Sequence, residues 1–430
     1  MEDRVRVVLP EGYDLVVGDT FQLFYRGLVE AVNPYNYDIL AVCEKGRNYP
    51  RYFEFTPEEE GVYPLVIRVF ANDKTLLAAG KTLLRVCRAK AAPKKEVNIL
   101  CIGDSLTVSG EWVHEAYRRL TATGGEPEGL GFSGFRFIGT CLKGKAGFEG
   151  YGGWKWDDYL GYTRNAVWVV CRHNKSEQDQ HSVWKDAVGG SWSLETIEQY
   201  RLKFVCVDAQ TKPEADTILT HCANGRNTES IWVTDSYKEY GNPFWDEKKQ
   251  SVDFKSYCRR HHYDRIDAVY IMLTWNGSPR LDNLRAYSLE LAAKGKQLVD
   301  ILHNQYPDAK VRIMGLQVPS VNGGCGASYG ARLPYCDAYG MVRYVMELNK
   351  VYQEWAQEEK YRDYVEFIHI SGQFDSEYNM PREEKCVNTR NHLKETVGSN
   401  GCHPLHAGYL QIGDAVYRNL IKSFCCEETG

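Results

Sequence analysis

The sequence contains no apolar run close to the roughly 20 residues that cross a bilayer, so we expect no membrane contact. Its first residues, Met1-Glu-Asp-Arg-Val-Arg-Val7, also lack the apolar core of a signal peptide. The chain as written is therefore expected in the cytoplasm. It would be secreted instead if a leader had preceded Met1.

Two further absences exclude whole classes of function. The sequence contains no Lys/Arg-rich run that could bind along a phosphate backbone, and the net charge is −5. We therefore expect no nucleic acid partner. The 14 cysteines form no CxxC pair and no Cys/His cluster at zinc-ligand spacing, so they mark no zinc site. No cofactor is expected. The hydrophobic fraction of 43% and charged fraction of 25% are those of an ordinary globular protein.

A chain of 430 residues exceeds what one compact core normally organises, and its pattern changes near residue 92. Before that point, short segments rich in β-branched and aromatic residues are separated by turn residues, which predicts an immunoglobulin-like β-sandwich over residues 1–92. The expected strands are 5–9, 20–25, 37–42, 52–56, 62–70 and 82–87. Residues 88–96 are small and polar, as in a linker.

From residue 97 onward, apolar runs alternate with longer amphipathic segments, which predicts a doubly wound α/β domain over residues 97–430. The expected strands are 97–102, 135–139, 268–273, 310–316 and 365–369, and the expected helices are 111–123, 284–306, 339–360 and 407–424. The alternation breaks over about 164–245, which we interpret as a β-rich insertion. Nine of the Trp, Tyr and Phe residues from Trp168 to Trp245 are candidates, and one or two of them could offer stacking platforms for sugar rings.

The segment Asn98-Ile-Leu-Cys-Ile-Gly-Asp-Ser-Leu-Thr107 predicts a strand, a tight turn and the start of a helix. Such a turn lifts the Ser105 hydroxyl clear of the strand, and the helix N-terminus directs free backbone N–H groups toward a developing oxyanion. Ser105 is therefore a candidate nucleophile. A serine at this position is equally common as a helix cap.

Three further segments favour the catalytic interpretation. Gly153, in Gly150-Tyr-Gly-Gly-Trp154, could bring a backbone N–H close to a reacting carbonyl, and Asn276 follows a central strand, where it could donate its amide to an oxyanion. His403 lies on a loop before the last helix and next to Pro404, so it is the candidate general base. His406 is the weaker candidate because it would point along the helix entrance.

Taken in order, the Ile-Gly-Asp-Ser-Leu, Gly-Gly-Trp, Trp-Asn-Gly and His-Pro-x-x-x-Gly-Tyr blocks resemble those of SGNH (GDSL) hydrolases over residues 97–424. The resemblance implies a flavodoxin-like three-layer α/β/α hydrolase that needs no metal. It also implies Ser105 as nucleophile, His403 as base, and an oxyanion hole of Ser105, Gly153 and Asn276. Many members with an added β-module deacetylate glycans.

The sequence departs from the family pattern at Asn400, where an Asp normally stands three residues before the catalytic His. A neutral amide cannot stabilise an imidazolium as a carboxylate does. A backbone carbonyl could orient His403 in a Ser-His dyad, a carboxylate such as Asp375 could take the missing place, or the enzyme could be weak. Asp104 is expected to stabilise the turn rather than to accept the catalytic proton.

The resulting hypothesis is a serine esterase that hydrolyses small acyl esters, with acetyl esters of a carbohydrate as the expected substrate. A short-chain lipolytic enzyme or a thioester hydrolase could use the same machinery. The third alternative is a glycan-binding protein on a degenerate hydrolase scaffold, which the change at Asn400 and the aromatic insertion would suit.

Overall fold

The computed structural model describes residues 5–161, 166–172, 184–185, 191–192, 203–208, 218–223, 226–240, 242–246, 248–273, 276–277, 279–320, 324–330 and 334–426, and from residue 162 to residue 241 it describes strand backbones alone. The chain forms two compact units, one drawn from residues 1–156 and 262–430 and the other from residues 157–261. The larger unit is a mixed α/β structure of sheets and helices.

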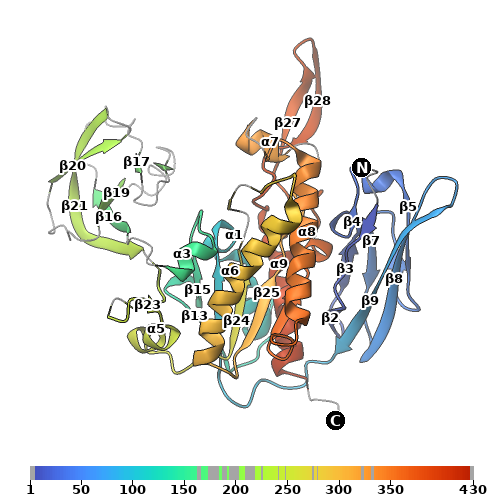
Figure 1. Ribbon diagram of the computed structural model, residues 1–430, viewed down its shortest axis with the longest axis horizontal. Helices are drawn as coiled ribbons and strands as arrows, with labels where there is room; N and C mark the ends of the chain where they lie inside the picture. Colours follow the sequence, from blue (N-terminus) through green and yellow to red (C-terminus); the bar gives the residue numbers. More distant parts are fainter. Residues whose placement is uncertain are drawn as a thin grey trace. The chain divides into compact units, whose positions relative to one another are not determined.

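A seven-stranded sheet lies at the centre of the larger unit (Figure 1). Its strands run in the order β14-β15-β10-β24-β25-β26, β13 also pairs with β10, and every pairing except β14 with β15 is parallel. Their bounds are β10 Val97–Gly103, β13 Phe135–Ile138, β14 Cys141–Lys143, β15 Ala146–Gly150, β24 Ala268–Met272, β25 Lys310–Met314 and β26 Val365–Ile368.

The strand order reverses at β10, because the chain returns on the other side of that strand when it reaches β24. Gly103, the last residue of β10, is paired with Gly150 of β15 and with Met272 of β24. The carboxyl ends of three parallel strands therefore meet at one point. In open α/β sheets, ligands bind at such a reversal.

The five strands that the sequence predicts in this part of the chain coincide with β10, β13, β24, β25 and β26. Strands β10 and β24 are buried along their whole length, as expected for continuous apolar runs covered on both faces. Strands β14 and β15 were not predicted. The β15 sequence, Ala-Gly-Phe-Glu-Gly, contains two glycines and no β-branched residue, so no strand signal was present.

The helices pack in pairs. Helices α6 (Leu284–Gln305) and α8 (Ala338–Gln357) lie side by side (Figure 1). Helix α2 (Glu111–Thr121) packs against α9 (His406–Phe424). All four correspond to predicted helices. The shorter ones are α1 (Ser105–Val108), α3 (Trp156–Leu160), α5 (Phe254–His261) and α7 (Gly324–Tyr329), with η1 (Tyr25–Gly27), η2 (Pro34–Asn36) and η3 (Ser371–Gln373). No helix within the described residues combines the length and the apolar character needed to cross a bilayer.

The N-terminal part, residues 5–87, contains two larger sheets with a common apolar core, one in the order β2-β9-β8-β5 and the other in the order β3-β7-β6. Strands β1 and β4 form a further two-stranded sheet. Buried and more exposed side chains alternate along β8 from Tyr63 to Val69, as they do in a strand with one face on a core. The bounds are β1 Arg6–Val7, β2 Gly12–Val16, β3 Phe21–Phe24, β4 Val29–Glu30, β5 Asp38–Val42, β6 Arg47–Asn48, β7 Tyr52–Phe55, β8 Gly61–Phe70 and β9 Leu76–Cys87. Strand β2, which pairs with β9 in parallel, was not predicted.

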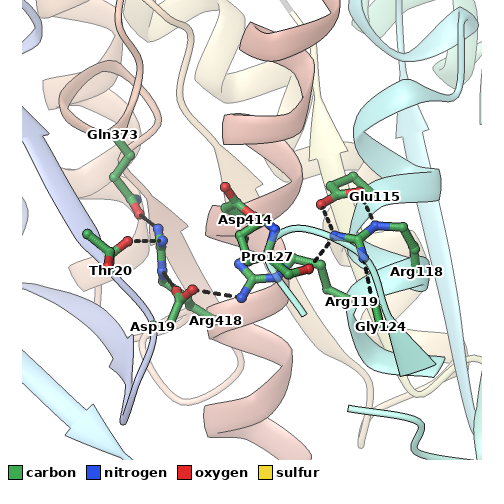
Figure 2. A network of polar contacts seen from close by, with 10 residues as sticks. All are labelled: Asp19, Thr20, Glu115, Arg118, Arg119, Gly124, Pro127, Gln373, Asp414 and Arg418. Atoms are coloured by element: carbon green, nitrogen blue, oxygen red, sulfur yellow. Dashed lines mark hydrogen bonds and ion pairs between the residues drawn. The ribbon is translucent and has the colours of Figure 1, made fainter. Parts of the chain in front are cut away.

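Buried ionic groups join this N-terminal part to α2 and α9 (Figure 2). The Asp19 carboxylate accepts from Arg119 of α2 at 2.7 Å and from Arg418 of α9 at 2.5 Å. Burial raises the pKa of Asp19, but the two guanidinium groups outweigh burial and hold that pKa below its ordinary value. Arg119 also pairs with Asp414 of α9 at 2.7 Å, and Arg418 donates to the Gln373 side chain.

A neutral pair completes the same junction. The Tyr13 hydroxyl lies 2.7 Å from Nδ1 of His369, and both side chains are almost fully buried. Burial lowers the pKa of His369 to about 3, so the imidazole is uncharged at neutral pH.

The smaller unit contains a four-stranded antiparallel sheet in the order β19-β16-β21-β20. The bounds in this unit are β16 Ala166–Arg172, β17 Trp184–Lys185, β18 Ser191–Trp192, β19 Lys203–Asp208, β20 Ile218–Ala223, β21 Arg226–Tyr240, β22 Trp245–Asp246 and β23 Ser251–Val252. Phe244 is fully buried against Phe254 and Tyr257 of α5. The side chains proposed as sugar platforms from Trp168 to Tyr240 lie outside the described residues.

In the larger unit, β11 (Thr123–Gly124) pairs with β12 (Gly129–Leu130), and the exposed hairpin of β27 (Arg382–Asn388) and β28 (Asn391–Gly398) precedes the His403 loop.

Candidate active site

Ser105 stands at the first position of α1, directly after β10. The turn between them requires Gly103, because a Cβ there would lie 2.0 Å from Oγ1 of Thr107 and 2.7 Å from the carbonyl of Met272. Asp104 is fully buried and caps α1, accepting at Oδ1 from the Leu106 N–H at 3.0 Å. The turn is thus held by Asp104, as expected from the sequence, and the Ser105 side chain is left partly exposed.

The His403 ring lies against this serine. Its Nε2 is 2.8 Å from Ser105 Oγ, although the two residues are 298 positions apart in the sequence. Burial lowers the pKa of His403 below its ordinary value. At neutral pH the ring is therefore uncharged, and Nε2 can accept the serine proton when the other ring nitrogen carries the hydrogen.

Gly153 and Asn276 follow the two strands that flank β10. Gly153 has a φ of +82° in the turn after β15, and that turn is tied to β10 by a 3.0 Å bond from the Tyr151 N–H to the Gly103 carbonyl. Asn276 donates from Nδ2 to Asp104 Oδ2 at 3.2 Å and to the Trp154 carbonyl at 3.0 Å. Its amide therefore links the serine turn to the Gly153 turn.

These four residues line one cavity of about 300 Å³. The structure therefore brings Ser105, Gly153, Asn276 and His403 together at the carboxyl edge of the sheet, where the strand order reverses. The remaining lining residues are Leu106, Lys155, Gly277, Tyr329, Tyr335 and Cys402.

Neither of the two residues proposed to orient His403 is hydrogen-bonded to its ring. Asp375 accepts from Arg51 of the N-terminal part at 2.7 Å, so its carboxylate belongs to an ion pair away from the imidazole. Asn400 lies near His403 but contacts its backbone, since Oδ1 accepts from the N–H groups of Cys402 and His403 at 2.9 and 3.0 Å. Within the described residues, no hydrogen bond reaches Nδ1 of His403. His406 pairs with Glu111 on the protein surface.

Several residues around the site were not predicted. Gln317 is fully buried behind the His403 loop and donates from Nε2 to the Cys402 carbonyl at 2.7 Å. Its position shortly after β25 could have marked it, because polar residues beyond the carboxyl ends of parallel strands build sites. The Tyr335 hydroxyl donates to the Gly277 carbonyl at 2.7 Å. Tyr335 follows no strand, so no sequence pattern marked it as a site residue.

Among the described residues, no group of three or more His, Cys, Asp or Glu is arranged to hold a metal ion. Cys325 and Cys402 lie beside the site as free thiols, with their sulfur atoms 3.9 Å apart.

No protein-family model matches the chain, and no curated protein matches it. A family 3 carbohydrate esterase of Clostridium thermocellum is similar in fold at 14% identity, with a TM-score of 0.34 over 77% of this chain and 100% of that one. A carbohydrate esterase family 2 enzyme with a carbohydrate binding domain, from Corynascus thermopiles (Myceliophthora fergusii), is 12% identical, with a TM-score of 0.31 over 97% and 98% of the chains. A family two carbohydrate esterase from Cellvibrio japonicus is 13% identical, with a TM-score of 0.24 over 98% and 96%.

Proposed function

We propose that this protein is a serine esterase that hydrolyses small acyl esters through an acyl-enzyme, with acetyl esters of a carbohydrate as its substrate class. The observation that carries the proposal is the 2.8 Å contact between Ser105 Oγ and His403 Nε2 inside the cavity at the sheet reversal. A hydroxyl this close to a neutral imidazole is the arrangement that nucleophilic acyl transfer requires.

In the first step, Ser105 Oγ attacks the ester carbonyl carbon while His403 Nε2 accepts the hydroxyl proton. The tetrahedral intermediate then expels the alcohol, which takes that proton from His403. Water, deprotonated by His403, attacks the acyl-enzyme and releases the acid, and Ser105 regains its proton. Within the described residues, no carboxylate contacts the His403 ring, so we assign the stabilisation of the imidazolium to the cavity and to the developing oxyanion.

The oxyanion is assigned to the N–H groups of Ser105 and Gly153 and to the Asn276 amide. Neither of the two N–H groups donates a hydrogen bond within the described residues, so both are open to a ligand. Asn276 already donates to Asp104 and to the Trp154 carbonyl, so it must exchange one of these bonds for the oxyanion. Donors of this kind act in the transition state and are worth about 3 kcal/mol each.

The size and lining of the cavity support the proposed substrate class. About 300 Å³ is at the lower limit of ligand pockets, which suits a short acyl group with part of its alcohol. Tyr329 and Tyr335 both line the cavity, with their ring centroids 4.8 Å apart. The half-buried Tyr329 ring offers aromatic surface to a sugar.

We propose the domain organisation that the sequence suggests. A β-sandwich module spans residues 1–92, and a flavodoxin-like three-layer SGNH hydrolase domain spans residues 97–430 with an insertion over about 164–245. The shared core of the two N-terminal sheets and the strand order of the parallel sheet support this organisation.

The test is hydrolysis of p-nitrophenyl acetate, butyrate and octanoate by the wild type and by Ser105→Ala, together with release of acetate from an acetylated polysaccharide. Acetate-preferring activity that Ser105→Ala abolishes is the expected result. Rates that rise from acetate to octanoate would indicate a lipolytic enzyme. Glycan affinity without turnover, unchanged in Ser105→Ala, would overturn the esterase proposal in favour of a binding protein.

A further inference from the structure

The peptide group that precedes His403 is held at both of its polar atoms. Its carbonyl oxygen, that of Cys402, accepts from Gln317 Nε2 at 2.7 Å. Its N–H, that of His403, donates to Asn400 Oδ1 at 3.0 Å. The two partners are side-chain amides from different parts of the chain, and together they fix the plane of one peptide.

Both amides have a chemically determined orientation. Only the NH₂ group of Gln317 can donate to a carbonyl, and only the oxygen of Asn400 can accept from two N–H groups, those of Cys402 and His403. Gln317 is fully buried, and its own Oε1 has no hydrogen-bond partner among the described residues.

The neighbouring residues leave the loop little room. A Cβ at Gly401 would lie 2.2 Å from the backbone nitrogen of Cys325, so the loop lies directly on α7. Pro404 on the other side restricts the backbone of His403 to extended conformations. With the preceding peptide plane fixed as well, the position of the His403 Cβ is determined and the ring keeps two side-chain torsions.

This arrangement suggests how His403 is aimed without a carboxylate. Within the described residues, nothing is bonded to the ring except Ser105, so the ring is oriented from its backbone. Asn400 occupies the position of the family's aspartate but contacts the main chain instead of the imidazole.

We propose that Asn400 and Gln317 are positioning residues that hold the peptide before His403 and thereby place its Nε2 against Ser105. The inference rests on the proposed esterase function for its catalytic consequence. It also has a consequence independent of turnover, because a correctly placed Nε2 that accepts from Ser105 keeps the ring proton on Nδ1.

Four variants test the inference. Asn400→Ala removes the acceptor and Asn400→Asp restores it, while Gln317→Met removes the donor and keeps a side chain of similar size. Asn242→Ala is the control, because Asn242 is a buried amide that donates to the backbone carbonyls of Tyr159 and Gly161 in the other unit. Thermal unfolding identifies the variants that are folded.

The first readout is kinetic, with p-nitrophenyl acetate as substrate. We expect Asn400→Ala and Gln317→Met to lower kcat by about 10- to 100-fold with little change in KM, since misplacement of a reacting group by about 1 Å has this order of effect. Asn400→Asp and Asn242→Ala should stay within about threefold of the wild type. If kcat is unchanged in both disrupted variants of an active enzyme, the inference fails while the esterase proposal stands.

The second readout is the ¹⁵N spectrum of the His403 ring, assigned with His403→Gln and recorded above the imidazole pKa. The wild type and Asn400→Asp should show a single tautomer with the proton on Nδ1, and the two disrupted variants should show a mixture. A single tautomer in the wild type, in Asn400→Asp and in both disrupted variants would overturn the inference. An inactive wild type whose spectra nevertheless follow the expected pattern would overturn the esterase proposal and retain the positioning role.

Discussion

Helix α9 joins two regions that use polar side chains in opposite ways. Near Asp414 and Arg418, it contributes to a buried network of full charges with Asp19 and Arg119 (Figure 2). Just before its first turn, the His403 loop is held by neutral amides, and its imidazole meets a hydroxyl.

The difference follows from what each region does with protons. Buried charges need opposite charges, and the Asp19 network pairs each carboxylate with a guanidinium that keeps its proton at every accessible pH. The candidate site instead has to pass a proton from Ser105 to His403 and back, which requires a base whose two protonation states are close in free energy. Because the described groups around His403 are neutral, burial is the effect that shifts the free-energy difference between its two protonation states.

The strongest test of this contrast is removal of the reacting groups. Ser105→Ala and His403→Ala should each lower kcat by about 10⁴-fold or more, because the nucleophile and its base act as a unit. Thermal unfolding should change little, since Ser105 and His403 are only partly buried. Esterase kinetics and a thermal melt on the same samples check both halves. Residual activity near the wild-type level would contradict the assigned pair.

The stability of the junction between the N-terminal part and the rest of the larger unit should depend on pH through His369. Its folded pKa of about 3 lies below the ordinary value of 6.5, so below 6.5 the unfolded chain binds a proton that the folded chain excludes. The free energy of unfolding should therefore fall with decreasing pH, by at most about 1.4 kcal/mol per pH unit from this residue.

His369→Gln isolates that contribution, because it keeps a polar partner for Tyr13 without a titrating ring. Urea unfolding between pH 4 and pH 7 should give a smaller slope in the variant. Equal slopes in the two proteins would show that His369 is not the titrating group.

Removal of Asp19 should destabilise the fold without changing the esterase activity of the folded protein. Asp19→Ala leaves Arg119 and Arg418 buried with fewer opposite charges, which should cost about 3–5 kcal/mol in the free energy of unfolding. Asp38→Ala is the matched control, because its ion pair with Lys74 is exposed and should contribute less than about 1 kcal/mol. Denaturant unfolding measures both. Similar losses in the two variants would show that the buried charges around Asp19 contribute no more than an exposed ion pair.

Asn276 lies between the two extremes, as a neutral side chain bonded to the carboxylate of Asp104. Asn276→Ala should lower kcat by about 10² to 10³-fold through loss of an oxyanion donor. Steady-state kinetics with p-nitrophenyl acetate, with circular dichroism as the check on folding, measures this effect. Unchanged turnover would remove Asn276 from the oxyanion hole.

The smallest effect concerns the pH profile. Only neutral His403 can accept the proton, and burial lowers its pKa, so kcat/KM should rise with pH and reach half its maximum below pH 6.5. A midpoint above 6.5 would mean that a negative charge acts on the ring. The same profile for Asn400→Asp should show whether a carboxylate at that position reaches the imidazole.

The local pattern of the sequence predicts most of the elements around the site. The apolar run before Gly103 predicts β10, and amphipathic spacing predicts α2, α6, α8 and α9 to within a few residues at each end. These elements bury one face or both, so the spacing of apolar residues along the sequence identifies them. Strand β15 was not predicted because Ala146–Gly150 has little of the composition that marks a strand. Strand β2 was not predicted because Gly12 and Asp14, which are rare in strands, interrupt its short apolar pattern.

The sequence by itself determined the chemistry that is present: a serine after a strand, an asparagine and a glycine after two others, and a histidine before the last helix. Only the tertiary structure decided what these groups touch. It placed Asp375 on Arg51, turned Asn400 toward the backbone of His403, and brought Gln317 behind the same peptide. The physical reason is that hydrogen bonds and ion pairs depend on distances of a few ångströms between residues that the chain separates by tens or hundreds of positions. No local pattern encodes such distances.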